Sequence, residues 1–514
     1  MILSNTVLFV FITFISFIGY MDRGIIPGAS VQINAFIAQQ FPDNENPDTL
    51  FGLLQSAFVA GYSVSCLIST NALHTHTWDF VLLVTMVLFT LTLVGCGLSG
   101  ESFGNYYMLL AFRALSGGSE AACLCIFPPL IQDRAKNDSV AKWLSFYFTS
   151  IPLGVAVGYV YGAYVAQQYD WKYAYYLEAV TMIPVLLFLF FVVRKSEEEQ
   201  LTSIDKRGLL EPGSPLISEN CRGKRLSSPK NSSTRRVSRL EDLAEIPSIR
   251  EELMSCLNSP VFVLIVLSYS SYTATITAVA TYGSSFFLAL GFFDDEVKAA
   301  FVFGGIVCVA GIVGTPMGGV IIDRFKGTSS SYLNDRDTET DIDRETDTDR
   351  EEETKFRILE TILNLMTLII VCGMVIVWQI TYVESKTIFL TCILAGCLTL
   401  FMSTSFFNLG SMLAVPSEHR PFAVGLLSLA IHAFGDVPSP IIIGYIKDYL
   451  APLCNVDADG NFIDIDGCKS QSGGIRETLQ IAIGWLIFCP VFSFIGARVA
   501  RASYKNLQNK RMRV

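Results

Sequence analysis

Apolar segments about as long as a lipid bilayer is thick recur along the whole chain. Twelve of them follow one another between residues 5 and 498, separated by polar stretches. A helix needs roughly 20 mostly apolar residues to cross the hydrocarbon core, and a segment of that length satisfies its own backbone hydrogen bonds only as a helix. The sequence therefore predicts an all-α membrane protein. The expected helices lie near 5–38, 50–73, 79–99, 105–127, 141–166, 171–194, 260–290, 297–323, 356–380, 387–410, 421–450 and 475–498.

The composition agrees with this prediction. Of the 514 residues 51% are hydrophobic and 16% are charged, which is too little charge for the surface of a soluble domain of this size. The apolar run that begins at Met1 lacks the basic start and the small-residue cleavage site of a signal peptide, so we expect a retained first helix.

Residues 335–353 hold eleven acids and three arginines, −8 of the net charge of −10. No nucleic-acid partner is expected.

Basic residues lie on one side of the predicted topology. Segment 195–258 and the tail 501–514 are rich in Lys and Arg, whereas 27–49 and 99–104 contain neither. Because basic loops stay in the cytosol, we expect both termini there and an even number of spans. The expected parts are a six-helix half at 1–194, a disordered cytosolic linker at 195–258, a second half at 259–500 with an acidic loop at 327–355, and the basic tail.

Charged residues inside the spans are the first candidate functional residues, because each is costly in lipid. Asp22 and Arg23 lie midway along the first expected helix, and Arg113 and Glu120 share one face of the fourth. A carboxylate beside an arginine can bind and release a proton as its surroundings change. Asp22 and Glu120 are therefore candidate proton-coupling residues and Arg113 a candidate substrate contact. The alternative is a structural ion pair of Arg113 with Asp22 or Glu120.

Two helices of the second half carry further candidates. The segment 421–450 has His432 and Asp436 on one face, followed by two prolines that loosen a helix. These two side chains are interpreted as a substrate contact or a hinge anchor. The segment 260–290 is rich in hydroxyl groups, so it is expected to border a cavity. The candidate cavity residues are Tyr272, Thr273, Thr277 and Tyr282.

Other patterns limit the chemistry. Gly154, Gly158 and Gly162 recur every four residues and indicate close helix contact. Cys454 and Cys468 share a polar loop placed outside the cytosol, where a disulfide and two free thiols both fit the sequence. The chain has no phosphate-binding Gly-x-x-x-x-Gly-Lys-Ser/Thr motif, no metal-ligand set and no catalytic signature. A cofactor, a metal and an enzymatic activity are therefore not expected.

Several motifs resemble the major facilitator superfamily and, within it, the Spinster family of lysolipid and sphingolipid transporters. The motifs that are similar to those of the family are Gly19-Tyr20-Met21-Asp22-Arg23, Gly52-Leu53-Leu54-Gln55-Ser56-Ala57-Phe58, the runs 113–121 and 146–154, and His432-Ala433-Phe434-Gly435-Asp436-Val437-Pro438-Ser439-Pro440 with Gly444-Tyr445-Ile446-Lys447-Asp448. Gly19 stands where the family usually has Asn. The resemblance covers both halves but neither long loop.

The resemblance implies twelve helices in two pseudo-symmetric bundles and a monomer that moves lysophospholipids or sphingoid lipids by alternating access, with or without proton coupling. It assigns coupling to Asp22 and Glu120. The superfamily's gating motif is kept at 318–324, with Asp323 and Arg324, but its counterpart after the second helix is altered. His74 stands where the motif has Asp, so a pH-sensitive gate is a hypothesis. A lysosomal or endosomal membrane is implied by the family, and the plasma membrane is the alternative.

Two rival functions stay open at this point. The same fold carries other solutes, so a carrier of a small organic anion or sugar is the first rival. The second is a non-transporting membrane receptor that keeps the fold. The intact Asp22, Arg113 and Glu120 argue against a receptor, whereas the altered position His74 is compatible with one.

Overall fold

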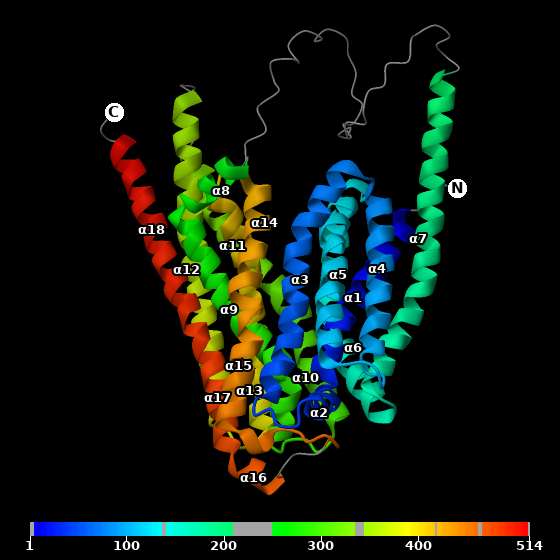
Figure 1. Cartoon of the computed structure of the whole chain (residues 1–514). Helices are drawn as coiled ribbons and strands as arrows, with labels where there is room; N and C mark the ends of the chain where they lie inside the picture. Colours follow the sequence, from blue (N-terminus) through cyan, green and yellow to red (C-terminus); the bar gives the residue numbers. More distant parts are fainter. Residues whose placement is uncertain are drawn as a thin grey trace.

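The computed structural model describes residues 5–135, 140–208, 249–334, 344–416, 419–460 and 465–511, nearly all of them helical (Figure 1). The first half contains α1 (Asn5–Gly28), α2 (Ser30–Gln40), α3 (Pro47–Thr75), α4 (Trp78–Leu98), α5 (Tyr106–Arg134), α6 (Val140–Gln168) and α7 (Trp171–Gly208). The second contains α8 (Ile249–Leu257), α9 (Pro260–Ala289), α10 (Glu296–Val309), α11 (Thr315–Asn334), α12 (Arg344–Trp378), α13 (Lys386–Leu413), α14 (Arg420–Ile431), α15 (Pro438–Leu450), α16 (Ile465–Ser470), α17 (Ser472–Gly484) and α18 (Phe488–Arg511).

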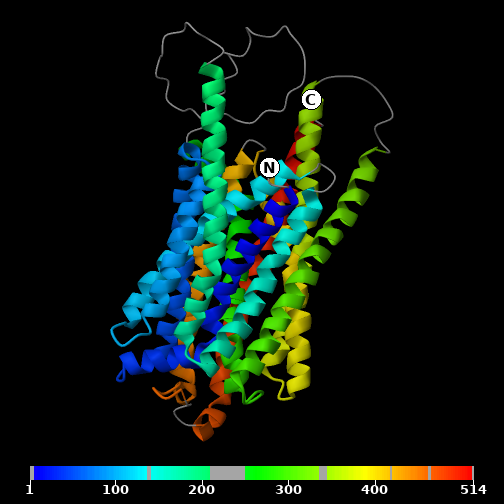
Figure 2. The ribbon, with the colours of Figure 1, turned by 90° about the vertical axis from the view of Figure 1, so that its right-hand side faces the viewer.

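Twelve segments of the described chain are long and apolar enough to span a membrane, as the sequence predicted. The prediction of one continuous first helix over 5–38 is wrong in one respect. Pro27, which has no backbone N–H, and Gly28 end α1, and α2 then lies across the axis of α1 (Figure 2). Asp22 is therefore close to the end of its helix instead of midway along it.

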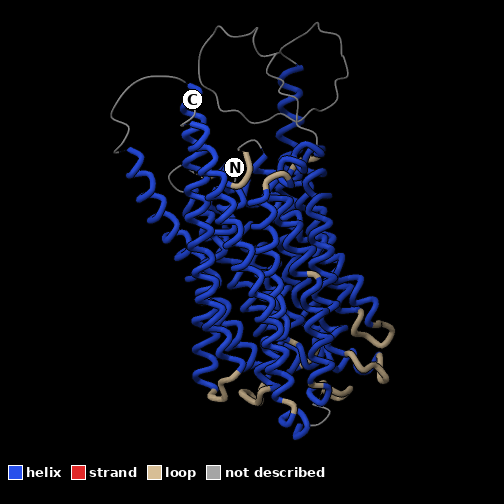
Figure 3. Tube along the Cα trace, turned by 90° about the vertical axis from the view of Figure 1, so that its left-hand side faces the viewer, coloured by secondary structure: helices blue, strands red, loops and turns tan. Residues whose placement is uncertain are grey.

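The two ends of the molecule differ. We call the end that holds α8 and the last turns of α7 and α18 the linker end, and the opposite end, with α2 and α16, the loop end (Figure 1). Several of the loops and turns gather at the loop end (Figure 3). Cys454 and Cys468 form a disulfide there, which settles the choice that the sequence left open.

Small residues bring α1 against α6. A Cβ on Gly158 would lie 2.1 Å from the carbonyl oxygen of Met21, and one on Gly162 would lie 2.6 Å from that of Ile25. Gly24 approaches the carbonyl oxygen of Val155 in the same way, at 2.5 Å. These approaches confirm the contact predicted from the glycine repeat, and they fix the height of Asp22 and Arg23 in the bundle.

Two spans of the second half contain a π-helical turn. One covers Ala310–Gly314 and joins α10 to α11 into a single span, and the other covers His432–Asp436 between α14 and α15. A π-helical turn inserts one extra residue into a helix, and such turns are frequent at functional sites. The prolines after Asp436 predicted a loosened helix, and the structure shows this turn ending at Asp436, one residue before Val437-Pro438 continues the span.

Hydrogen bonds join the two halves toward the loop end. The backbone N–H and hydroxyl of Thr49 donate to Asp448 over 2.9 and 2.8 Å, and Val31 N–H donates to Glu296 over 2.8 Å. Lys447 forms an ion pair with Asp48, and both side chains are buried. Tyr159 of α6 also donates to the carbonyl of Ala280 in α9.

The boundaries of the predicted parts remain predictions. The helix α7 continues to Gly208 and α8 begins at Ile249, both inside the segment 195–258 that was expected to be disordered. Likewise, α11 ends at Asn334 and α12 begins at Arg344, both inside the expected acidic loop 327–355. Residues 209–248 and 335–343, with the rest of both predictions, lie outside the described residues.

Candidate functional site: ion pairs of the first half and the polar turn of the second

Asp22 and Arg113 form a buried ion pair in the first half. Nη1 of Arg113 in α5 lies 2.7 Å from Oδ2 of Asp22 in α1, and both side chains are 0% exposed. The ring of Phe58 lies 4.5 Å from the Arg113 guanidinium. Of the two partners proposed for Arg113, the structure selects Asp22. The predicted substrate contact of Arg113 is not supported, because its side chain is sealed in this conformation.

Arg23 pairs with Glu120 and is the more accessible cation. Its Nη2 donates to Oε1 of Glu120 over 2.9 Å and its Nε to Oε2 over 3.3 Å, a two-pronged contact. The side chain of Arg23 is 21% exposed, whereas that of Glu120 is 7% exposed. The carbonyl of Arg23 also accepts a hydrogen bond from Gln55. Arg23 stood out in the sequence as a charge inside a span, but no role was predicted for it.

Aromatic rings surround the Arg23 guanidinium and lead to the second half. Its central carbon lies 4.6 Å from the ring centres of Tyr20 and Tyr62 and 5.1 Å from that of Phe58. The ring of Tyr62 meets that of His432 edge to face, with centres 5.7 Å apart. Stacking of this kind stabilises a cation that is partly removed from water. The ring pair joins the Arg23 site in α1 and α3 to the π-helical turn of the other half.

His432, Asp436 and Thr277 form a polar group on the opposite side of that contact. Nδ1 of His432 lies 2.6 Å from Oδ2 of Asp436, and the Thr277 hydroxyl donates to Oδ1 over 2.8 Å. Gly435 lets the turn approach α9, since a Cβ there would lie 2.2 Å from the Thr273 hydroxyl. The predicted residues Thr273, Thr277, His432 and Asp436 are thus brought together.

Two other hydroxyl residues of α9 lie elsewhere. Tyr272 is buried inside the second half, donates to the carbonyl of Leu400 over 3.2 Å and packs on Phe407. Tyr282 donates to the carbonyls of Asp48 and Pro440 over 2.7 and 2.8 Å in the loop-end contact. The number of hydroxyl residues in a helix does not show which of its faces borders a cavity. The structure therefore does not support a common cavity wall for Tyr272 and Tyr282.

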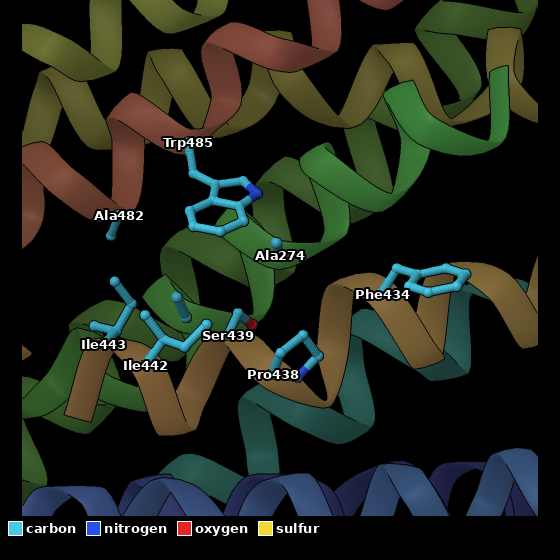
Figure 4. A pocket seen from close by; sticks show the side chains of 9 residues that line it. Ala274, Phe434, Pro438, Ser439, Ile442, Ile443, Ala482 and Trp485 are labelled. Carbon is cyan, nitrogen blue, oxygen red and sulfur yellow. The ribbon is translucent and has the colours of Figure 1, made fainter. Parts of the chain in front are cut away.

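Two pockets adjoin these groups. One, with a cavity volume of about 20 Å³, is apolar and lies between α9, α15 and α17 (Figure 4). Ala482 and Trp485 lie on one side of it and Pro438, Ser439 and Ile442 on the other. The second pocket, with a cavity volume of about 10 Å³, is lined by Glu120 together with Ser16, Tyr20, Tyr62 and Tyr147. An apolar pocket therefore starts directly beside the polar turn.

The predicted gating residues are not tested by these contacts. His74 lies in the last turns of α3, and its side chain is outside the described part of the structure. Asp323 and Arg324 lie in α11 and have exposed side chains. Their roles remain predictions.

Sequence reasoning missed several buried charges. Asp48, Glu296 and Lys447 belong to the contact between the halves, and Glu178 is buried in α7. The signal for Glu178 was the one used for Asp22, an acid inside an apolar run. The loop-end acids gave a weaker signal, because they stand at the ends of expected helices, where charges are ordinary.

Comparisons with known proteins agree with this architecture. The model of the family described as Major Facilitator Superfamily matches residues 12–440. Probable sphingolipid transporter spinster homolog 3 of Arabidopsis thaliana is 26% identical over 462 residues, which cover 87% of this chain and 80% of that protein. Protein spinster homolog 3 of Danio rerio is 23% identical, and the match covers 87% of this chain and 78% of that protein.

Solved structures show the same fold. A bacterial homolog to the human lysosomal transporter Spinster, in an inward-facing and unoccupied conformation, superposes with a TM-score of 0.69 at 15% identity, covering 97% of this chain and 98% of its own. The D-xylose-proton symporter gives a TM-score of 0.57 at 14% identity, with 92% and 96% covered. This chain is therefore a membrane transporter of the Major Facilitator Superfamily and belongs to its Spinster family.

Proposed function

We propose that the protein carries lysophospholipids or sphingoid lipids across a membrane by alternating access, coupled to protons. The observation that carries the proposal is the ion pair of Arg23 and Glu120. It is partly exposed, framed by aromatic rings, and adjacent to the contact between the halves. The printed names of the relatives, which include sphingolipid transporters, support a lipid substrate.

The pair offers a direct route to coupling. An anionic headgroup competes with Glu120 for the guanidinium of Arg23, because both bind the same two donors. Once released, Glu120 is a buried carboxylate without a counter-ion and takes up a proton. Substrate loading and proton loading are then linked through one arginine. Asp22 and Arg113, sealed beside this pair, hold α1 against α5 in this conformation.

An amphipathic substrate fits the surroundings of the polar turn. His432 and Asp436 supply polar contacts, and the apolar pocket lined by Pro438, Ile442 and Trp485 supplies a wall for a hydrocarbon chain (Figure 4). Burial of apolar surface contributes roughly 25 cal/mol per Å². The surfaces that bind the hydrocarbon chain and the headgroup of the lipid would therefore be neighbours.

The same proposal includes the orientation. The basic segment 195–258 and the basic tail belong in the cytosol, so both termini are cytosolic and the loop end faces the other side. The disulfide of Cys454 and Cys468 at the loop end supports this, since disulfides persist outside the cytosol. The structure then represents a conformation closed on the non-cytosolic side, in a lysosomal, endosomal or plasma membrane. His74, Asp323 and Arg324 are proposed for the cytosolic gate, and the protein is proposed to act as a monomer.

Uptake by proteoliposomes tests the proposal. Labelled lysophospholipid uptake is measured with and without a pH gradient for the unchanged protein, for Glu120→Gln and for the control Glu101→Gln, whose carboxylate bonds Lys172 away from the site. We expect the gradient to accelerate uptake by the unchanged protein and the control, and Glu120→Gln to keep only exchange of lipid for lipid. Gradient-driven uptake by Glu120→Gln would refute the coupling. Uptake of a sugar or organic anion without lipid uptake would favour the rival substrate classes.

A further inference from the structure

One buried carboxyl group has no task in the mechanism above. Glu178 of α7 is 0% exposed, and neither of its carboxyl oxygens has a hydrogen-bond partner among the described residues. The hydroxyl of Tyr175, one turn earlier on the same helix, is also buried without a partner in that part of the chain. Buried polar groups are normally bonded, so this site needs a physical explanation.

Glu178 lies at the depth of the Asp22–Arg113 pair. Helices α5 and α7 both begin at the loop end, and Arg113 and Glu178 each stand seven residues after the first residue, Tyr106 and Trp171. At 1.5 Å per residue, both side chains lie about 10 Å into the bundle. Asp22 stands six residues before α1 ends at the same side.

The groups around Glu178 leave it without a free cation. Its electrostatic neighbours from the helices packed around it are Asp22 of α1, Cys96 of α4, Arg113 and Glu120 of α5, Tyr161 of α6 and Tyr175 of α7. Arg113 is the one cation in this set. Its Nη1 binds Asp22 at 2.7 Å, and its buried Nε and Nη2 have no hydrogen-bond partner among the described residues, so Glu178 does not contact the guanidinium in this conformation.

The charges do not balance if every group is ionised. Asp22, Glu120 and Glu178 are three carboxyl groups, and Arg23 and Arg113 are two guanidinium groups, which leaves a charge of −1. An unpaired carboxylate inside a low-dielectric bundle is costly and tends to become neutral by binding a proton. Asp22 and Glu120 each contact a guanidinium, at 2.7 and 2.9 Å, so Glu178 is the group with most to gain from neutrality.

We propose that Glu178 binds a proton in this conformation and is a further proton site of the transporter. Its use depends on the proposed proton coupling. The counter-ion of Arg113 can then be exchanged by a proton transfer. The O–H bond of Glu178 breaks and an O–H bond forms on Asp22, so that the Glu178 carboxylate replaces the Asp22 carboxylate as the counter-ion of Arg113. The proton changes place and the total charge of the five groups stays the same.

Infrared spectroscopy tests the protonation without any substrate. The full chain is placed in lipid nanodiscs at neutral pH, and the carbonyl band of protonated carboxylic acids is compared between the unchanged protein and three variants. We expect Glu178→Gln to remove a band that Glu120→Gln and Glu101→Gln leave in place. A spectrum in which Glu178→Gln removes nothing, or in which Glu120→Gln removes that band, would overturn the proposal.

Thermal unfolding of the same variants gives an independent test. Glutamine has the shape and the neutrality of a protonated glutamate, so Glu178→Gln should unfold within a degree or two of the unchanged protein. A large loss of stability would mean that Glu178 is an ionised second counter-ion of Arg113, which contradicts the proposal. Because neither test measures transport, a failure of lipid uptake would count against the proposed function and leave this inference standing.

Discussion

Arg23 and Arg113 have different tasks although each pairs with a carboxylate. Arg113 is fully buried with Asp22, whereas a fifth of the Arg23 side chain is exposed beside three aromatic rings. A buried pair of this kind holds two helices together, and a partly exposed pair can exchange its anion for a ligand. Substitutions at the two arginines should therefore have different effects.

At Arg23 we expect a change in substrate affinity. Arg23→Lys keeps the charge but loses the second hydrogen bond and the stacking on Tyr20 and Tyr62. The concentration for half-maximal lipid uptake should rise about tenfold, equivalent to about 1.4 kcal/mol, with the pH-gradient effect retained. Arg23→Gln should lose the gradient effect altogether. An unchanged half-maximal concentration in Arg23→Lys would argue against a headgroup contact.

At Asp22 we expect a change in stability. Asp22→Asn removes the carboxylate bonded to Arg113, which would cost about 3–5 kcal/mol in the free energy of unfolding if the buried guanidinium stayed unpaired. Because Glu178 can release its proton and balance Arg113, we expect a smaller loss in Asp22→Asn and the full loss when Glu178→Gln is added. The double variant Asp22→Asn with Arg113→Met should recover part of that loss. Melting temperatures in detergent measure both effects. If Asp22→Asn melted like the unchanged protein, the pair would have no structural task.

The sequence predicted which residues belong to the site better than how they pair. Asp22, Arg113 and Glu120 stood out because a charge in an apolar run is rare. Their partners depend on how α1, α3 and α5 are rotated and set in height, which a single span does not determine. The assignment of Arg23 to Glu120, and of Arg113 to Asp22, therefore became visible only in three dimensions.

Among the elements, the contact of α1 with α6 depends on missing side chains. Gly158→Ala places a methyl group 2.1 Å from the carbonyl oxygen of Met21, so the helices must move apart, at about 1–3 kcal/mol. The control is Gly425→Ala, where a Cβ meets nothing within 4 Å. The melting temperature should fall for Gly158→Ala and not for Gly425→Ala. Equal melting temperatures would contradict the close packing.

Helix positions were predictable because the apolar period and length are local properties of the chain. The end of α1 at Gly28 and the two π-helical turns were not located by the same reasoning. Pro27 and Pro438 signal a break nearby, but whether the backbone bends, widens into a π-helical turn or stays straight depends on the neighbouring helices. Residue Gly435, for example, is explained by its approach to Thr273 in another helix.

For the whole molecule, the contact between the halves at the loop end should set the balance of conformations. Lys447→Gln removes the partner of buried Asp48 and so disfavours the conformation closed at that end. We expect spin labels at positions 39 and 458, whose native residues are hydrogen-bonded across the halves, to show a larger population of long distances. The control is Lys386→Gln, because Nζ of Lys386 lies over the ring of Phe293, a residue of the same half. An identical distance distribution in Lys447→Gln would mean that the pair does not hold this end closed.

Alternating access is the claim on which the transport mechanism depends, and paired distances at both ends test it most directly. Spin labels are placed at positions 39 and 458 at the loop end and, in a separate sample, at 67 and 424 on α3 and α14 toward the linker end. Acidification with lysophospholipid present should lengthen the first distance and shorten the second. Distances that stay fixed, or that change in the same direction at both ends, would contradict the mechanism.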